Sequence, residues 1–101
     1  MEIFETSIFT QAVSSILADG DYKRLQKSLV FRPAAGKLIP KGGGLRKLRW
    51  NVGKTEGLRL IYLFESRRKA VHMIWIYRKS KQEDFTPDQL KALAKTVREN
   101  L

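Results

Sequence analysis

Apolar residues near the start of the chain recur at helical spacing. Between Ser7 and Gly20 they repeat every three or four positions, at Phe9, Ala12, Val13, Ile16 and Leu17. This spacing predicts one apolar face of a helix. Ser7 is the expected N-cap, because its hydroxyl can accept a hydrogen bond from a first-turn backbone N–H. We expect this helix to break at Asp19-Gly20.

A second helical pattern follows at once. Tyr22, Leu25 and Leu29 fall on one face, and the opposite face is basic, with Lys23, Arg24 and Lys27. Pro33 and Gly36 end the unit. Two short helices joined this tightly predict an αα-hairpin.

The remaining patterns predict strands and a last helix. Residues 3–5 suit a short edge strand, and the glycine run 42–44 suits a loop or tight turn. Three longer strands are predicted over 45–51, 58–65 and 70–79, and the short turns between them favour antiparallel pairing.

The final segment opens with a capping box. Thr86 is the expected N-cap, Pro87 fits the first helical position, and Gln89 can reach back to the Thr86 backbone. An apolar stripe follows, at Leu90, Leu93, Val97 and Leu101. With 101 residues the chain suits one domain over 1–101. The predicted fold is α+β: an αα-hairpin packed on a small antiparallel sheet, with a C-terminal helix.

Charge is concentrated in the middle of the chain. The net charge is +10, and residues 36–81 carry thirteen Lys and Arg against only Glu56 and Glu65. The flanking segments are nearly neutral. A focused basic surface is typical of proteins that bind a polyanion, most often a phosphate backbone, although a solvated face that aids solubility gives the same count.

The composition excludes several kinds of site and several classes of protein. The chain has no cysteine, which excludes disulfides, thiol catalysis and Cys-ligated zinc and is compatible with the cytosol. No apolar run approaches the roughly 18 residues of a membrane span. The N-terminus lacks the basic and apolar regions of a secretory signal. We therefore expect a cytoplasmic protein without a membrane partner.

Strand alternation brings candidate chemistry to one face of the sheet. Lys47 and Arg49 share a face, while Leu48 and Trp50 share the other. Tyr77 and Lys79 are two positions apart at the end of the last strand, so they also share a face. If the register allows it, five side chains converge on one patch: Lys47, Arg49, Arg59, Tyr77 and Lys79.

Arg59 is the most informative of these residues. It interrupts an apolar run between Leu58 and Leu60, where an unpaired charge would be costly to bury. A buried ion pair and an anion site both explain it. Because few acids lie nearby in the sequence, we favour the anion site.

Such a cluster has the groups that RNA cleavage needs. The 2′-OH must lose a proton and attack phosphorus, the phosphorane gains negative charge, and the leaving 5′-oxygen needs a proton. Arg and Lys can stabilise the phosphorane, and a Lys or Tyr can move protons. No metal or other cofactor is required. The lone histidine, His72, lies among apolar strand residues, and we interpret it as structural.

Other residues leave two interpretations open. Trp50, Tyr62 and Trp75 suit either base stacking or the core. The 67–69 turn suits either solubility or contact with ribosomal RNA phosphates. The candidate RNA-binding residues outside the catalytic set are Arg46, Lys54, Arg67, Arg68, Lys69, Arg78 and Lys81.

Several stretches together resemble a known family. They are FETSIF, DYKRLQKSL, PAAGKLIPKGGGLRKLRW, LRLIYLF, MIWIYRKSK and DFTPDQLKAL. Nearly the whole chain is similar to toxins of the RelE/ParE superfamily, and most of all to HigB-like RelE-type toxins. GGGLRKLRW followed by LRLIYLF is the specific part, since each half alone is weak.

The resemblance implies an mRNA interferase. Such toxins enter the ribosomal A site, with contacts to 16S ribosomal RNA, and cut mRNA by a metal-free 2′-OH attack. Lys47 and Arg49 look like the family's basic strand pair, Arg59 like its strand arginine, and Lys79 like its catalytic basic residue. Some members have a tyrosine where this chain has Phe85, so either Tyr77 substitutes or Lys79 and Lys81 suffice.

The resemblance also implies a partner. Toxins of this type are neutralised by a cognate antitoxin, in HigB-like systems often a HigA-like helix-turn-helix protein. Two other functions stay open: a ParE-like gyrase-inhibiting toxin and a non-enzymatic RNA-binding or ribosome-binding module. The basic residues of LRKLRW, LRLIY and YRK argue against the ParE-like type.

Overall fold

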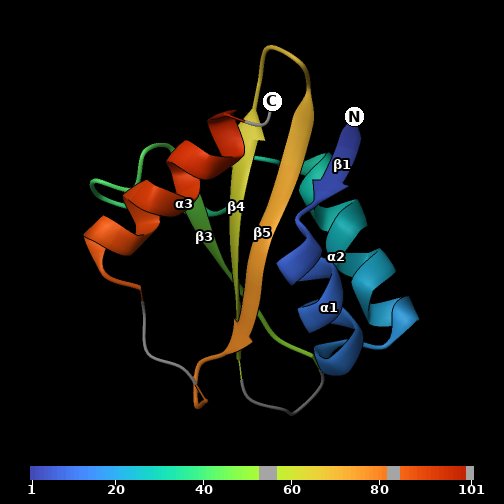
Figure 1. Cartoon of the computed structure of the whole chain (residues 1–101). Helices are drawn as coiled ribbons and strands as arrows, with labels where there is room; N and C mark the ends of the chain where they lie inside the picture. Colours follow the sequence, from blue (N-terminus) through green and yellow to red (C-terminus); the bar gives the residue numbers. More distant parts are fainter. Residues whose placement is uncertain (53–56, 82–84, 100–101) are drawn as a thin grey trace.

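The described part of the chain folds as three helices and a five-stranded sheet. The computed structural model describes residues 1–52, 57–81 and 85–99. Within these ranges the elements are β1 (Glu2–Glu5), α1 (Ser7–Ile16), α2 (Asp19–Phe31), β2 (Lys37–Leu38), β3 (Leu45–Trp50), β4 (Leu58–Glu65), β5 (Ala70–Arg78) and α3 (Pro87–Glu99) (Figure 1). The predicted α+β class, the αα-hairpin and the C-terminal helix are confirmed.

The sheet is mixed, so the prediction of an antiparallel sheet was wrong for one strand. The strand order is β1-β5-β4-β3-β2. Strands β2 to β5 pair antiparallel, but β1 pairs parallel with β5, from Glu2 opposite Ala70 to Glu5 opposite Met73. Short turns favour antiparallel pairing only for the strands that they join directly. Most of the chain separates β1 from β5, which is ample for the crossover that a parallel pair needs.

The edges of the sheet are short strands. β1 forms one edge, as predicted, and β2 forms the other. No sequence pattern predicted β2, because a two-residue strand is too short to show alternation. A register shift between Ile61 and Tyr62 interrupts the β4–β5 ladder.

The hairpin boundaries differ from the prediction by one or two residues. The N-cap of α1 is Thr6, not Ser7: its Oγ1 accepts a hydrogen bond from the Phe9 N–H at 3.0 Å. The break lies at Leu17 and Ala18, which have extended backbone angles, and Asp19-Gly20 already belongs to α2. An aspartate in the first turn is favourable because it faces the positive end of the helix dipole.

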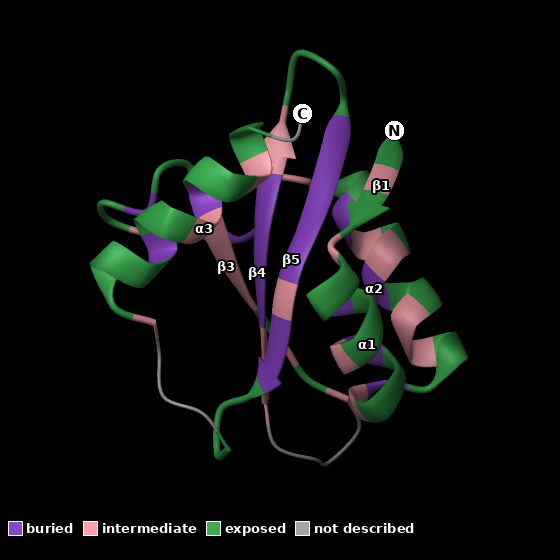
Figure 2. Cartoon of the chain, in the orientation of Figure 1, coloured by how far each residue is buried: buried purple, intermediate pink, exposed green. Residues whose placement is uncertain are grey.

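The sheet separates two hydrophobic cores. On one face α1 and α2 contribute Phe9, Val13, Leu17, Leu25 and Leu29 to a core with Leu58, Leu60, Tyr62, Val71, Met73 and Ile76. On the other face α3 contributes Leu90 and Ala94 to a core with Leu45, Ile61, Leu63, Ile74 and Tyr77. β4 and β5 therefore lie between two layers of helix and are mostly buried along their length (Figure 2).

Two contacts hold α3 in place. The predicted capping box is present: the Thr86 N–H donates to Gln89 Oε1 at 2.9 Å, and the Gln89 N–H donates to Thr86 Oγ1 at 3.2 Å. At the other end Arg98 Nη2 donates to the Gly43 carbonyl at 3.0 Å. Leu101, the last residue of the predicted stripe, lies outside the described residues. None of the helices in the described ranges has the length and apolar character needed to cross a lipid bilayer.

Candidate functional site

The strand register brings the predicted side chains together. Arg49 on β3 lies directly opposite Arg59 on β4, and Arg59 lies directly opposite Tyr77 on β5. Cβ atoms of such cross-strand pairs are about 4.5–5.5 Å apart. Lys47 precedes Arg49 by two positions and so points to the same face. These side chains therefore form one cluster. We call it the cationic cluster, and it consists of Lys47, Arg49, Arg59, Tyr77 and, just beyond β5, Lys79.

The cationic cluster lies on the face of the sheet that α3 partly covers. Tyr77 belongs to the core beneath α3, whereas Leu48 and Trp50 pack on the hairpin side. Arg49 is exposed, and Lys47 and Arg59 are half-buried. Solvent therefore reaches these cations at the end of the face where β3 and β5 finish.

Arg59 occupies the centre of the cluster. Its Nη1 donates to the Leu58 carbonyl at 3.1 Å, and its guanidinium passes over Gly57. Among residues 1–52, 57–81 and 85–99, no carboxylate forms an ion pair with it. Of its two predicted uses, the described contacts fit an anion site better than an interior ion pair.

Lys79 and Tyr77 border Arg59 in different ways. Lys79 is exposed just beyond β5, and its backbone N–H donates to the Gly57 carbonyl at 3.3 Å. Tyr77 is only 3 % exposed, and its ring meets Phe85 edge-on at 6.2 Å between centroids. Tyr77 thus forms part of the floor of the cluster, while Lys79 stands in solvent. Proton transfer by Tyr77 or by Lys79 stays a prediction.

Arg46 has a different environment from the one predicted. It lies opposite Tyr62, on the hairpin side of the sheet. Its Nη1 donates to the carbonyls of Gly36 at 2.8 Å and Ala34 at 3.2 Å. Its guanidinium therefore anchors the loop after α2, on the face opposite the cationic cluster, and the prediction of an RNA contact has no support in this geometry.

The other predicted RNA-binding residues fall into two places. Arg67, Arg68 and Lys69 are exposed at the tip of the β4–β5 hairpin, at the top of Figure 1. Glu65, beside this tip, lies six positions along β4 from Arg59, about 20 Å of extended chain. Arg78, the last residue of β5, and Lys81, just beyond β5, are exposed; Arg78 lies opposite Leu58 and so has the parity of the hairpin side, not that of Tyr77. Lys54 lies outside the described residues.

The three aromatic candidates for base stacking contribute to the two cores instead. Tyr62 is fully buried, accepts a hydrogen bond from the Gly36 N–H at 2.8 Å and donates to the Pro33 carbonyl at 2.8 Å. Trp50 packs against the hairpin-side core, and half-buried Trp75 lies against Phe85 at 6.3 Å. The structure thus decides for the core at all three positions.

His72 is distant from Arg59 along the sheet. It stacks on Phe4 with ring centroids 5.2 Å apart, and its Nε2 lies 3.3 Å from Glu65 Oε1. It lies opposite Leu63, four residues along β4 from Arg59. This environment fits the structural role that the sequence predicted. Within the described part of the chain, no three His, Asp or Glu side chains gather where they could hold a metal ion.

Two residues contribute to the site through contacts that were not expected from the sequence. Gly57 lies under the Arg59 guanidinium: a Cβ built on it would be 2.8 Å from Arg59 Nη1 and 3.1 Å from Asn51 Oδ1. Phe85 packs on Tyr77 and Trp75. The position of Gly57, directly before the strand that carries Arg59, was a signal, since a glycine at a strand often marks a place where another group approaches the backbone closely.

The comparison with known families adds no assignment. No protein-family model matches this sequence.

Proposed function

We propose that the chain is a metal-independent endoribonuclease of the RelE/HigB toxin type, which cleaves mRNA in the ribosomal A site. One observation carries the proposal: the alignment of Arg49, Arg59 and Tyr77 across three adjacent strands, with Lys47 and Lys79 beside them. Several cations around one open spot on a sheet would hold a phosphodiester and stabilise its transition state.

The groups of the cluster can divide the reaction among them. Arg59, half-buried and central, binds the scissile phosphate and takes up the charge of the phosphorane. Lys47 and Arg49 hold the flanking backbone. Lys79, exposed at the rim, transfers a proton to or from the reacting oxygens. The 2′-oxygen bonds to phosphorus as the bond to the 5′-oxygen breaks, leaving a cyclic phosphate and a 5′-OH.

The ribosome and an antitoxin complete the proposal. The exposed cations of the hairpin tip, Arg67 and Lys69, would contact 16S ribosomal RNA phosphates while the cationic cluster meets mRNA. The protein would be the toxin of a type II toxin–antitoxin pair, with a HigA-like helix-turn-helix antitoxin. Binding to ribosomes should weaken steeply as salt rises, because each phosphate contact releases counterions.

The decisive test compares two arginine variants in bacteria. We expect Arg59→Ala to abolish mRNA cleavage and growth arrest without unfolding the protein, because the side chain makes only one hydrogen bond in the described structure. Arg24→Ala is the matched control, since Arg24 is exposed on α2, across the sheet. Mapping new mRNA 5′ ends against reading frame gives the readout.

The outcomes separate the three candidate functions. Cuts in translated mRNA that vanish only with Arg59→Ala support the nuclease. Chromosome breaks with intact mRNA would identify a gyrase poison, and ribosome binding without cuts a passive module. A folded Arg59→Ala variant that still cuts mRNA would remove Arg59 from the mechanism.

A further inference from the structure

The basic face of the sheet continues past β3 onto the edge strand β2. Lys37 on β2 lies directly opposite Lys47 on β3. Residues directly opposite each other in an antiparallel pair point to the same face, so Lys37 shares the face of the cationic cluster. The position of Ile39 agrees with this parity, because it follows Lys37 by two positions and packs in the core beneath α3. No role was predicted for Lys37 from the sequence.

Lys37 extends the cationic cluster into a band that crosses the sheet diagonally. Opposed cations occur twice in this band, as Lys37 with Lys47 and as Arg49 with Arg59. From Arg59 to Lys37 the band crosses two gaps between strands and shifts by two positions along them, which separates the Cβ atoms by about 12 Å. Side chains stand roughly perpendicular to a sheet, so Lys37 and Arg59 would meet different phosphates of one nucleic-acid strand.

β2 and β3 come from a stretch of the chain without acidic residues. Residues 22–55 contain neither Asp nor Glu, and they include both strands and the loop between them. Lys37 is exposed, and among residues 1–52, 57–81 and 85–99 no carboxylate forms an ion pair with it. An anionic strand that crosses β3 toward β2 would therefore meet attraction at both strands.

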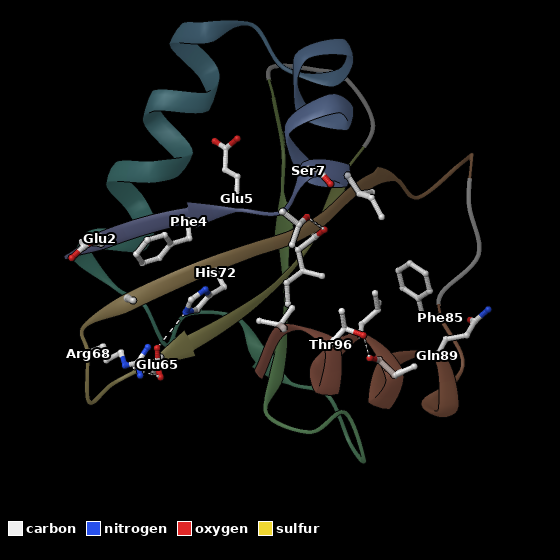
Figure 3. Close-up of a pocket in the computed structure, with 17 residues that line it drawn as sticks. Glu2, Phe4, Glu5, Ser7, Glu65, Arg68, His72, Phe85, Gln89 and Thr96 are labelled. Carbon is white, nitrogen blue, oxygen red and sulfur yellow. Dashed lines mark hydrogen bonds and ion pairs between the residues drawn. The ribbon is translucent and has the colours of Figure 1, made fainter. Parts of the chain in front are cut away.

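The opposite direction across the sheet is less favourable for an anion. Beyond β5, toward β1, this face opens into a groove whose described lining has three carboxylates and one cation, namely Glu2, Glu5, Glu65 and Arg68 (Figure 3). Carboxylates repel phosphates, whereas every charged residue of β2 and β3 is a cation. An RNA strand held at Arg59 would thus run toward β2 rather than toward β1.

Protection of the sheet edge is the other physical reason for a lysine on β2. Charged side chains, lysine above all, keep an edge strand from pairing with another molecule. β2 is only two residues long, however, and Leu38 beside Lys37 is 59 % exposed on the other face. A short edge needs little protection, and an edge selected against contact would not expose a leucine. Phosphate binding explains both the lysine and its like-charged neighbour.

We infer that Lys37 binds a phosphate that flanks the scissile one, so that single-stranded RNA crosses the sheet from Arg59 over Lys47 to the β2 edge. The inference rests on the proposed nuclease function for the identity of the scissile phosphate. The contact at Lys37 is nevertheless measurable as binding alone. Recognition of the substrate then extends past the cleavage position on the side that faces β2.

Binding of a non-cleavable RNA tests the contact. The probe is a fluorescent 2′-O-methyl oligonucleotide of about 10 nucleotides, within the site sizes of small single-strand-binding domains. It lacks the attacking 2′-OH and so stays intact. We expect Lys37→Gln to weaken binding by roughly 3-fold to 10-fold at low salt and to lower the steepness of log K against log salt by about 0.7, which is the contribution of one phosphate contact to a single strand. Lys27→Gln is the matched control, because it removes the same charge from an exposed position on α2, across the sheet, and should leave the salt dependence unchanged.

Two further substitutions separate phosphate binding from protection of the edge. Lys37→Arg should bind RNA like wild type, and Lys37→Glu should weaken binding more than Lys37→Gln although the edge keeps a charge. If Lys37 only protects the edge, Lys37→Gln would self-associate and Lys37→Glu would bind RNA like wild type, which would overturn the inference. Urea unfolding should give the same midpoint for all of these variants, because Lys37 is exposed.

Single-turnover cleavage of ribosome-bound mRNA separates this inference from the proposed function. Lys37→Gln should raise the protein concentration for half-maximal rate more than it lowers the maximal rate, since a flanking contact holds no reacting atom. If neither this concentration nor the salt dependence changes while wild type cuts mRNA, the inference fails and the nuclease stands. If wild type does not cut mRNA but Lys37→Gln weakens RNA binding as expected, the contact stands and the nuclease fails. A larger loss of affinity for poly-glutamate than for RNA would assign Lys37 to an acidic protein and overturn the inference.

Discussion

Gly57→Ala should move Arg59 without removing it. A Cβ at position 57 would lie 2.8 Å from Arg59 Nη1, whereas ordinary contacts begin at 3.4 Å, so the guanidinium must withdraw by about 0.6 Å. Preorganised sites tolerate shifts of about 0.5 Å, and a misplacement of about 1 Å can cost roughly 100-fold. We therefore expect cleavage to fall about 10-fold, less than for Arg59→Ala.

Stability should not fall with activity. The atoms that must move, Arg59 Nη1 and Asn51 Oδ1, are ends of flexible side chains, and the φ angle of Gly57 lies outside the left-handed region, so alanine fits the backbone. Replacing glycine at a compatible position stabilises by about 0.4–1 kcal/mol through the unfolded state. The expected signature is thus slower single-turnover cleavage of ribosome-bound mRNA with an unchanged or higher urea midpoint.

Two glycine variants are matched controls. At Gly20, in the first turn of α2, an added Cβ meets nothing within 4 Å, so Gly20→Ala should leave cleavage unchanged and stabilise by about 0.5–1 kcal/mol. At Gly36 an added Cβ would lie 2.7 Å from the buried ring of Tyr62. Gly36→Ala should therefore destabilise by about 1–3 kcal/mol, with normal cleavage per folded molecule. A folded Gly57→Ala variant with full activity would refute the idea that Arg59 needs this placement.

Three further results are expected. Lys79→Ala should slow single-turnover cleavage by roughly 10-fold to 100-fold at unchanged stability, since Lys79 is exposed; an unchanged rate would reassign its role to Lys81 or Tyr77. Tyr62→Phe should lower the free energy of unfolding by about 1–3 kcal/mol, because Gly36 N–H and Pro33 C=O lose their buried partner; a urea midpoint equal to wild type would contradict this. Burial, and then the hydrogen bond to Glu5, raise the pKa of Tyr22 above its usual 10.0. The stability this confers is complete below about pH 10 and is lost as the pH rises further, because the unfolded chain then releases the proton first. Urea unfolding across that range should show a shallower alkaline loss for Tyr22→Phe, and an equal slope would exclude Tyr22 as its source.

Sequence periodicity predicted the elements well wherever an element buries a regular face. Leu25 and Leu29 on α2 and Leu90 on α3 occupy the predicted apolar stripes and are buried. Boundaries were less predictable, as at Thr6, because Thr6 and Ser7 both have hydroxyls that could cap α1. The parallel pairing of β1 depends on a contact across most of the chain, which no local pattern encodes.

The candidate site was predictable in residue type and only partly in position. Parity placed Lys47 and Arg49 on one face, but register decides which residue of β4 or β5 meets them, and the turn-length argument does not fix it. Arg46 shows that residue type alone does not identify the site. It is as basic as its neighbours, but it points to the other face of the sheet, where its guanidinium donates to two backbone carbonyls. Its role follows from the loop at Gly36, which comes near only in the folded chain.

The cross-strand pair of Arg49 and Arg59 gives a last test of whether this surface is built for an anion. Two like charges directly opposite on a sheet are destabilising, here by a few tenths of a kcal/mol after solvent screening. A surface selected only for stability would not keep such a pair. A bound phosphate would attract both guanidinium groups and so turn the net contribution of the pair from destabilising to stabilising. Arg49→Gln should therefore raise the urea midpoint slightly while it weakens RNA binding, and added polyphosphate should stabilise wild type more than the variant. If Arg49→Gln instead lowers stability and polyphosphate stabilises both proteins equally, Arg49 supports the fold, and the cationic cluster loses one of its aligned members.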